Sequence, residues 1–260
     1  MAADPMVVAV IPAYNEARRI RALAEQVRER LARVIVVDDG STDGTAACLE
    51  GLPITLLRNP VNLGKGAGLQ RGFVAALEMG ASAVVTLDGD GQHRPEDIPR
   101  LLAAAEAWPR RIIIAARTGN RACAPPLRRF ANRFADFWIS WASGCPMIRD
   151  SQSGFRLYPS ELLRLRPLRP EERNTFVFES EVLIIAAHLG WYTEAVAIDA
   201  IYRPDNTSNY QAWADTWRIT RRVAGHLFRR GMYPAGLLRV LRVLPDPRKK
   251  NGPAARAPLS

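Results

Sequence analysis

Residues 84–98, VVTLDGDGQHRPEDI, decide how the first half of this 260-residue chain is organised. The run before Asp88 is apolar and rich in β-branched residues, which predicts a buried strand. Asp90 and Gln92 follow at intervals of two residues, with a glycine on each side of Asp90. We therefore expect the strand to end in a tight polar loop that carries two carboxylates and one amide.

Other short β-branched runs predict further strands, at 6–12, 33–39, 54–57 and 111–117. The segments between them favour helices: Asn15 and Thr42 are the expected N-caps of the first two, and a third is expected over 66–79. Pro95 is expected to open the next. This alternation predicts an α/β, Rossmann-like fold in which helices flank a mostly parallel sheet.

Beyond residue 118 the alternation stops. Helices are expected over 126–143 and 177–190, and strands over 154–159 and 195–202, the last at an edge of the sheet. The final dozen residues are rich in Pro, Ala and Lys, which is typical of disorder.

The net charge of +10 is concentrated near the C-terminus. Residues 213–250 hold ten Arg or Lys and two Asp, a net charge of +8. One face of a helix in this stretch would carry Arg218, Arg221, Arg222 and Arg229. Such a basic amphipathic segment favours an anionic membrane surface, and a helix that packs on the body with its arginines in solvent is the alternative.

These patterns divide the chain into a main domain over 1–212, a basic amphipathic helical extension over 213–246 and a disordered tail over 247–260. The start lacks the basic residues that precede the apolar core of a signal peptide, and no apolar run approaches the roughly 20 residues of a membrane span. We expect a cytoplasmic protein, peripheral at the inner face of the cell membrane. Its three cysteines are odd in number and scattered, as in a reducing compartment (Cys48, Cys123 and Cys145).

The two carboxylates of the loop after residue 87 point to a metal. Side chains held about 5 Å apart repel by several kcal/mol at low effective dielectric unless a cation or a proton separates them. Asp88, Asp90 and the amide oxygen of Gln92 are hard oxygen ligands, which favour Mg²⁺ or Mn²⁺. A solvated polar turn is the alternative, but the place of the loop at the end of a buried strand favours the metal.

Two other segments carry polar groups at strand ends. In VVDDGSTDGT (36–45), Asp39 could accept hydrogen bonds from a base or ribose. NLGKGAG (62–68) combines glycines, Lys65 and a helix start, which is typical of a phosphate-binding loop. It lacks the spacing of a P-loop, so we exclude a P-loop ATPase.

Taken together, six segments resemble one family. In chain order they are IPAYNE (11–16), VVDDGSTD (36–43), NLGKGAG (62–68), LDGDGQHRPEDI (87–98), RDSQSGFR (149–156) and FVFESEVL (176–183). The combination is similar to family-two glycosyltransferases of GT-A fold, in the branch of dolichol-phosphate mannosyltransferase-like and other polyprenyl-phosphate sugar transferases. The resemblance covers roughly residues 6–210, and it departs where many members have DADGQH and this chain has DGDGQH.

The resemblance implies a donor site for a UDP- or GDP-sugar and a bound divalent metal. Residues implied to bind the nucleotide sugar are Pro12, Ala13, Tyr14, Glu16, Asp39, Lys65 and Asp88. The metal would be held by Asp88, Asp90 and Gln92, with Asp90 essential for catalysis, and would neutralise charge on the departing nucleoside diphosphate.

The implied acceptor is a polyprenyl phosphate or another membrane-proximal group, and transfer would invert the anomeric carbon. Arg117 and Arg128 suit phosphate contacts, while Ser153 and Arg156 would shape the sugar and acceptor site. A phosphate acceptor needs no base, whereas a hydroxyl acceptor does. The base would then come from Asp150, Glu179 or Glu181, of which motif position favours Glu181.

Two rival functions stay open at the level of sequence. A sugar-phosphate nucleotidyltransferase shares the α/β layout, but the N-terminal IPAYNEARRI lacks the glycine- and arginine-rich loop expected there. A non-enzymatic protein that binds nucleic acid or membrane through its basic residues is the other. No nucleic-acid-binding motif accompanies the charge, so nucleic acid is not an expected partner.

Overall fold

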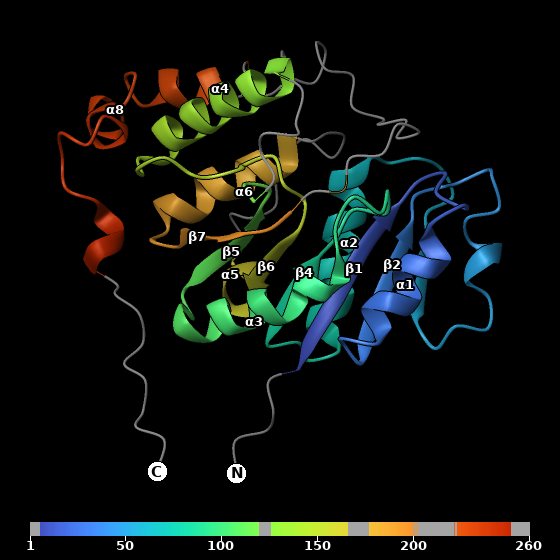
Figure 1. The fold of residues 1–260 in the computed structure, drawn as a ribbon. Coiled ribbons are helices and arrows are strands. Elements are labelled where there is room, and N and C mark those ends of the chain that lie inside the picture. The colour runs from blue at the N-terminus through green and yellow to red at the C-terminus, as the bar shows by residue number, and fades with distance from the viewer. Residues whose placement is uncertain are drawn as a thin grey trace, which may run out of the picture.

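A twisted β-sheet with helices on both faces forms the centre of the molecule (Figure 1). The computed structural model describes residues 6–119, 126–165, 177–199, 201, 221 and 223–250. Within these residues seven strands form one sheet, in the order β3-β2-β1-β4-β6-β5-β7. The strands are β1 (Val7–Ala13), β2 (Arg33–Asp38), β3 (Thr55–Arg58), β4 (Ala83–Thr86), β5 (Arg111–Ala116), β6 (Arg156–Pro159) and β7 (Tyr192–Ala197).

The sheet is mostly parallel, which confirms the predicted fold class. β1 pairs in parallel with β2 and β4, β2 with β3, and β5 with β7. β6 is antiparallel to both of its neighbours, β4 and β5. Because β6 runs against its neighbours, it begins at the end of the sheet where they finish, and this brings the segment before Arg156 to the carboxyl end of β4.

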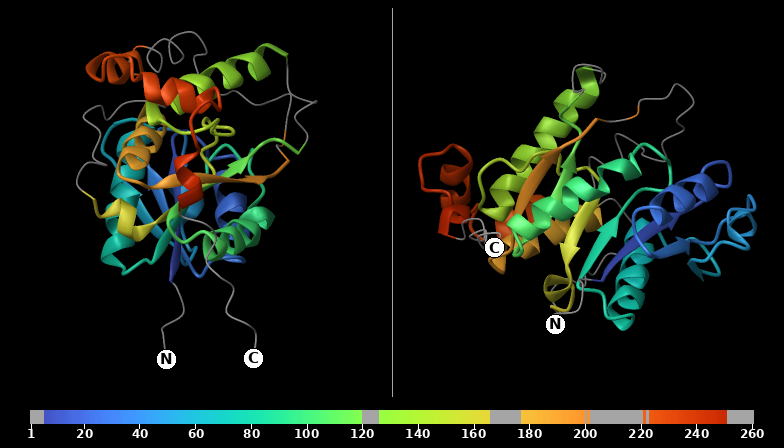
Figure 2. Two further views of the ribbon diagram at one scale, coloured as in Figure 1. Left: turned by 90° about the vertical axis from the view of Figure 1, so that its left-hand side faces the viewer. Right: turned by 60° about the horizontal axis from the view of Figure 1, so that its bottom comes forward.

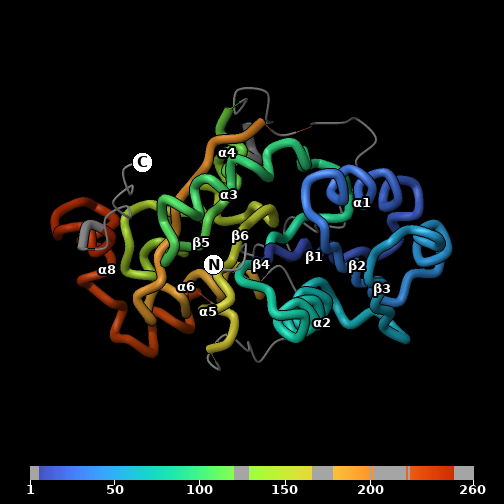
Figure 3. The backbone as a smooth tube through the Cα atoms, turned by 90° about the horizontal axis from the view of Figure 1, so that it is seen from below, coloured from blue at the N-terminus to red at the C-terminus, as the bar shows by residue number. Residues whose placement is uncertain are grey.

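The helices form two layers, as the view along the sheet shows (Figure 3). One face is covered by α1 (Ile20–Arg28) and α3 (Ile98–Ala107), and the other by α2 (Lys65–Glu78), α5 (Ser160–Leu163) and α6 (Val177–His188). Strand residues alternate between these layers: Val8 and Val10 join the cluster that includes α2, while Ala9 and Ile11 join the cluster around α1. This period of two explains why the strands are apolar throughout, since both faces are buried.

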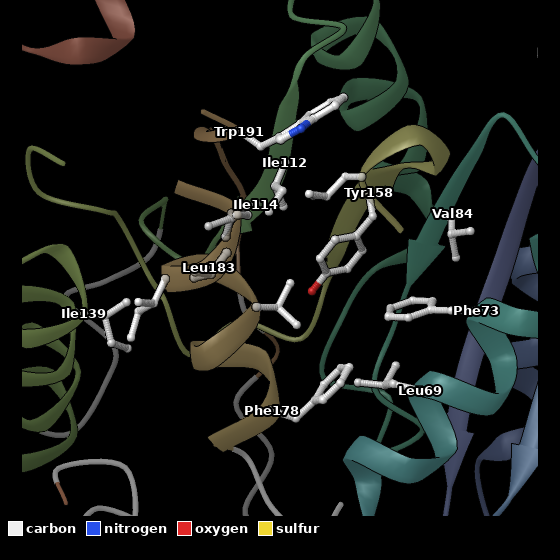
Figure 4. Close-up of a cluster of buried hydrophobic side chains, with 14 of the residues drawn as sticks. Leu69, Phe73, Val84, Ile112, Ile114, Ile139, Tyr158, Phe178, Leu183 and Trp191 are labelled. Carbon is white, nitrogen blue, oxygen red and sulfur yellow. The ribbon is translucent and has the colours of Figure 1, made fainter. Parts of the chain in front are cut away.

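An aromatic cluster anchors α2 and α6 to the middle of the sheet (Figure 4). Phe73 of α2 lies edge-on to Tyr158 of β6, with ring centroids 5.3 Å apart, and Phe178 of α6 lies 6.4 Å from Phe73. Tyr158 is fully buried, and its hydroxyl accepts a hydrogen bond from Arg156. The antiparallel strand is thereby fixed between the two helices that reach the polar end of the sheet.

The expected helix caps are wrong. α1 begins only at Ile20, and the Asn15 side chain accepts a hydrogen bond from the Thr42 amide instead of capping a helix. Thr42 does not cap the short 3₁₀ helix Ala47–Leu49 either. Both residues are used to join two loops, which a local capping pattern cannot anticipate. The other predicted elements are present with shifted ends; β7, for example, starts at Tyr192 and lies at the sheet edge as expected.

α4 (Pro126–Ser143) and α8 (Pro234–Val240) lie together across the end of the sheet to which the parallel strands point (Figures 1 and 2). Residues 223–229 are also helical, and Val223, Leu227 and Val240 belong to the same buried cluster as Ile139 of α4. Trp141 donates its indole N–H to the carbonyls of Met232 and Tyr233. The described part of the basic segment is therefore packed on the body, while Arg218 and Arg222 lie outside the described residues.

The close packing of α2 on the sheet gives a test of the fold. A Cβ at Gly72 would overlap Val10 of β1, whereas a Cβ at Gly68, one turn earlier, would lie 3.6 Å from Pro12 in ordinary contact. We expect Gly72→Ala to lower the free energy of unfolding by about 1–3 kcal/mol because it overpacks the core. Gly68→Ala is the matched control and should be neutral or stabilising by up to about 1 kcal/mol. Urea denaturation measures both, and equal effects would contradict this packing.

Candidate active site

The polar residues singled out from the sequence gather at the carboxyl ends of the strands. The loops after β1, β2 and β4 meet there, together with Arg117 after β5 and the start of α6. In parallel sheets this edge is where ligands bind, because the loops are free to vary while the strands fix their origins. The structure thus brings together residues that lie more than one hundred positions apart, such as Lys65 and Glu179.

The loops after β1 and β2 are joined by reciprocal hydrogen bonds. The Asn15 amide donates to Ser41 Oγ, and the Glu16 amide donates to Thr45 Oγ1. Asn15 has φ 56°, a left-handed conformation in which Asn is tolerated better than most residues. This conformation turns the chain sharply after Pro12 and Ala13, which are buried, so that Tyr14 and Glu16 stand at the rim.

Asp39 ties the loop after β2 to the loop before α2. It is only 3% exposed, and its carboxylate accepts hydrogen bonds from Asn59 Nδ2 and from the amides of Leu63 and Gly64, at 2.6–3.0 Å. The amides at the start of α2 therefore point at Asp39, which stabilises the helix N-terminus. The contact of Asp39 with a base, and phosphate binding by NLGKGAG, stay predictions.

Lys65 bridges two carboxylates from different elements. Its ammonium lies 2.5 Å from Asp88 Oδ1, after β4, and 2.7 Å from Glu179 Oε2, on α6. Burial alone would lower the pKa of Lys65, but the two carboxylates raise it. Burial alone would raise the pKa of Asp88, but Lys65, His93 and Arg117 lower it to about 2. Asp88 is therefore ionised and lies on the cationic side of the site.

Asp90 and Glu16 form the acidic side of the site. Burial raises the pKa of Asp90, and the charge of Asp88 raises it further. Burial and then the charge of Asp90 raise the pKa of Glu16 to about 7. The Asp90 carboxylate accepts hydrogen bonds from the Gln92 amide at 3.0 Å and from Gln92 Nε2 at 2.8 Å. Negative charge is thus crowded here.

This donor set fits a hard divalent cation. Carboxylate and amide oxygens are the ligands that Mg²⁺ and Mn²⁺ prefer, and the raised pKa values show that added positive charge would be favourable. In the parts of the chain that the structure describes, His, Cys, Asp and Glu side chains alone do not gather in a group of three or more that could hold a metal, so the set relies on the amide oxygen of Gln92 as well.

The glycines of the loop after β4 permit close approaches. A Cβ at Gly89 would lie 3.0 Å from the carbonyl oxygen of Pro12, so the loop packs directly on the end of β1. A Cβ at Gly154 would overlap the carboxylate of Asp88. Gly89 is the position where this chain departs from DADGQH, and the contact with Pro12 gives a physical reason for the smaller residue.

Arg117 and Asp150 are paired with each other. Arg117 donates to both carboxylate oxygens of Asp150 through its guanidinium, at 2.8 Å, and also through its backbone amide. Burial would raise the pKa of Asp150, but Arg117 lowers it. A carboxylate held ionised and doubly hydrogen-bonded is a poor proton acceptor, so the structure argues against Asp150 as the base.

Arg156 is fully buried, so any part it has in shaping the sugar and acceptor site is played from within the protein, and that role stays a prediction. Its guanidinium donates to the carbonyls of Ser151, Ser153 and Glu179. It therefore holds the SGF segment against the start of α6. Ser153 is also buried, and the side chain of Arg128 lies outside the described residues.

Three residues of the site were not assigned a role from the sequence. Asp136 of α4 accepts hydrogen bonds from the Asp150 and Ser151 amides, and burial raises its pKa to about 6. His226 Nε2 lies 3.4 Å from Glu181 Oε1 and so connects the C-terminal segment to α6. His93 is buried beside Phe155, and its ring nitrogens have no hydrogen-bond partner among the described residues. Of these three residues, only His93 lies beside a motif, the acidic loop, that could have marked it in the sequence.

A family model described as glycosyl transferase family 2 matches residues 8–164, more than half of the chain. The chain belongs to glycosyl transferase family 2. This confirms the resemblance that the six segments indicated, and the protein is a glycosyltransferase.

Relatives of this glycosyltransferase include enzymes named for lipid phosphate acceptors. The UDP-N-acetylglucosamine–dolichyl-phosphate N-acetylglucosaminyltransferase of Methanococcus voltae is 28% identical over 222 residues, which cover 77% of this chain and 87% of that protein. The undecaprenyl-phosphate mannosyltransferase of Micrococcus luteus is 29% identical over 214 residues, which cover 76% of this chain and 84% of that protein. These names correspond to the branch that the motifs predicted.

The fold of the glycosyltransferase is also found in solved structures. Glucosyl-3-phosphoglycerate synthase from Mycobacterium tuberculosis, in complex with UDP, superposes with a TM-score of 0.64 at 20% identity, over 86% of this chain and 80% of that one. The same enzyme has been crystallised with Mg²⁺ and UDP. At this level of identity the likeness concerns the fold.

The raised pKa of Glu16 predicts a pH-dependent stability of the metal-free glycosyltransferase. Between pH 4.5, the ordinary value, and about 7 the folded state binds more protons than the unfolded state, so Glu16 makes stability fall as the pH rises. Glu16→Gln removes this loss. The melting temperature of the variant should match wild type at pH 5 and exceed it at pH 8. If the melting temperatures of the variant and of wild type differed by the same amount at pH 5 and at pH 8, the burial of Glu16 beside Asp90 would be contradicted.

Proposed function

We propose that this enzyme transfers a sugar from a UDP- or GDP-sugar to a polyprenyl phosphate or another membrane-proximal acceptor, with inversion and with a divalent metal. The observation that carries the donor half is the crowding of Asp90 and Glu16 beside Asp88 at the end of β4, which favours a cation and an attached diphosphate. The names of the relatives support the acceptor half.

On the donor side, the nucleotide would lie between the loop after β1 and the acidic loop packed on it. Buried Pro12 and Ala13 and the half-buried Tyr14 and Glu16 would line this site. Asp88, Asp90 and Gln92 would hold Mg²⁺ or Mn²⁺. When bound, the metal would stabilise the negative charge that develops on the leaving diphosphate. Gln92 must turn its amide oxygen inward to serve as a ligand, since its Nε2 now donates to Asp90.

On the acceptor side, a phosphate oxygen attacks the anomeric carbon as the bond to the nucleoside diphosphate breaks. A phosphate is already anionic, so it requires no general base. This agrees with the low pKa of Asp150 and with Glu181, which is buried and paired with His226. We therefore favour a phosphate over a hydroxyl as the attacking group. A sugar-phosphate nucleotidyltransferase would instead release pyrophosphate, which distinguishes the rival by product analysis.

A surface on α4 and the C-terminal segment suits an anionic membrane. Its exposed apolar side chains include Phe228, at 71%, and Val243, at 68%, with Phe130 and Phe134 of α4 at the same end of the sheet. Arg221, Arg229 and Arg242 are exposed among them. Apolar side chains between arginines are typical of segments that lie in a membrane interface. Among the described residues, none of the helices combines the length and apolarity needed to cross a bilayer.

The donor half is tested by thermal shift. With UDP, GDP and their sugars in about 100-fold excess over Kd, one nucleotide together with Mn²⁺ should raise the melting temperature by about 5 °C or more. Asp90→Asn should lose that shift and most turnover because it loses an anionic ligand, while its metal-free melting temperature stays at or above wild type. An Asp90→Asn enzyme with wild-type activity and metal response would rule out the assignment.

The membrane surface is tested by sedimentation with anionic liposomes. Replacing Arg221, Arg229 and Arg242 by Gln should reduce binding, since each basic residue contributes about 1 kcal/mol near an anionic surface. Replacing Phe228, Leu241 and Val243 by Ser should reduce it at high salt as well, because apolar insertion is not screened. The matched control replaces Val61 and Val74, which are exposed residues in and near α2, by Ser, and this variant should bind liposomes as wild type does. A wild-type protein that never pellets at low salt would favour a soluble acceptor.

A further inference from the structure

Lys65 is the meeting point of three motifs that the sequence keeps apart. It opens α2 in NLGKGAG, Asp88 follows β4, and Glu179 lies in the first turn of α6. The ammonium contacts both carboxylates, at 2.5 Å and 2.7 Å. Phosphate binding by the α2 loop, the role expected from the sequence, does not by itself explain why the ammonium lies between two carboxylates.

The bridge is largely removed from water. The side chains of Lys65, Asp88 and Glu179 are 20%, 25% and 6% exposed. A charge in such a place is costly when it loses its partner, because it regains little hydration. The ionised carboxylates of Asp88 and Glu179 are therefore each stable only with a cation beside them. Taking up a divalent ion at Asp88 is an exchange of one cation for another.

The second carboxylate of the acidic loop is also supplied with internal donors. Both oxygens of Asp90 accept hydrogen bonds from Gln92, one from its backbone amide and one from its side chain. Without a ligand, both carboxylate oxygens of Asp90 therefore already have hydrogen-bond donors within the loop. A metal must replace these contacts in order to bind, and this lowers the affinity of the loop for the metal alone.

We propose that Lys65 is an internal counter-ion that competes with the divalent metal for Asp88, and that Glu179 retains the displaced ammonium. The inference rests on the metal-dependent function proposed above. Lys65 acts through Asp88 and is a positioning residue. Since the donor diphosphate brings further anionic oxygens to the metal, metal and nucleotide should favour each other's binding, and metal alone should bind weakly.

The test measures Mn²⁺ binding to the full-length, nucleotide-free protein by electron paramagnetic resonance. Lys65→Met keeps the length of the side chain and removes its charge, so it should tighten Mn²⁺ binding by about tenfold or more. Lys65→Arg keeps the charge and should leave the affinity at the wild-type level. Glu179→Gln should weaken Mn²⁺ binding, because the carboxylate that retains the ammonium displaced from Asp88 is then lost. A purely structural bridge would not produce shifts of opposite sign.

A second measurement repeats the titration with saturating UDP and, separately, GDP. Lys65→Met should bind Mn²⁺ more tightly than wild type in these titrations as well, because the competitor is absent with and without nucleotide. A well-folded Lys65→Met protein with unchanged or weaker Mn²⁺ affinity would overturn the inference while leaving nucleotide-dependent metal binding, and so the proposed function, intact. If Lys65→Met does not fold, unchanged or tighter binding by Glu179→Gln overturns it. Wild-type protein that binds no Mn²⁺ with either nucleotide overturns both proposals.

Discussion

The partly buried carboxylate of Asp88 at the end of a central strand is the constraint on which the site depends. An ionised carboxylate in this position must be compensated, and the compensation comes from three elements: Lys65 of α2, Arg117 after β5 and His93 of its own loop. Each of these contributors is fixed in turn. Asp39 anchors the start of α2, Asp150 orients Arg117, and Phe155 packs on His93.

Arg156 extends this dependence to the second half of the chain. Its side chain is fully buried, and its guanidinium donates hydrogen bonds to the backbone carbonyls of Ser151, Ser153 and Glu179 and to the Tyr158 hydroxyl. These bonds fix the segment under Asp88 and the beginning of α6 relative to β6. The insertion of an antiparallel strand between β4 and β5 is what brings the SGFR motif to the acidic loop.

The site is electrically divided. Lys65 and Arg117 hold Asp88 on one side, while Asp90 and Glu16 accumulate negative charge on the other. Such a division suits a reaction in which one group carries a metal with a leaving diphosphate and another group arrives as an anion. The C-terminal segment packs on the same end of the molecule. Trp141 and the buried Leu227 hold it on α4, and His226 contacts Glu181 on α6. The surface proposed for a membrane is therefore physically continuous with the helices that frame the site.

The sequence by itself determined the strand positions, the α/β class and the family. These depend on local periodicity and on motifs such as VVTLDGDGQH, in which neighbouring residues carry the signal. It also placed the acidic residues at the carboxyl ends of strands. Tertiary structure alone decided how they are used. Asn15 and Thr42 join two loops instead of capping helices, Asp39 accepts from the loop before α2, and Lys65 pairs with Glu179. Each partner comes from a distant segment, and charge compensation in a site with little water is a property of the assembled fold.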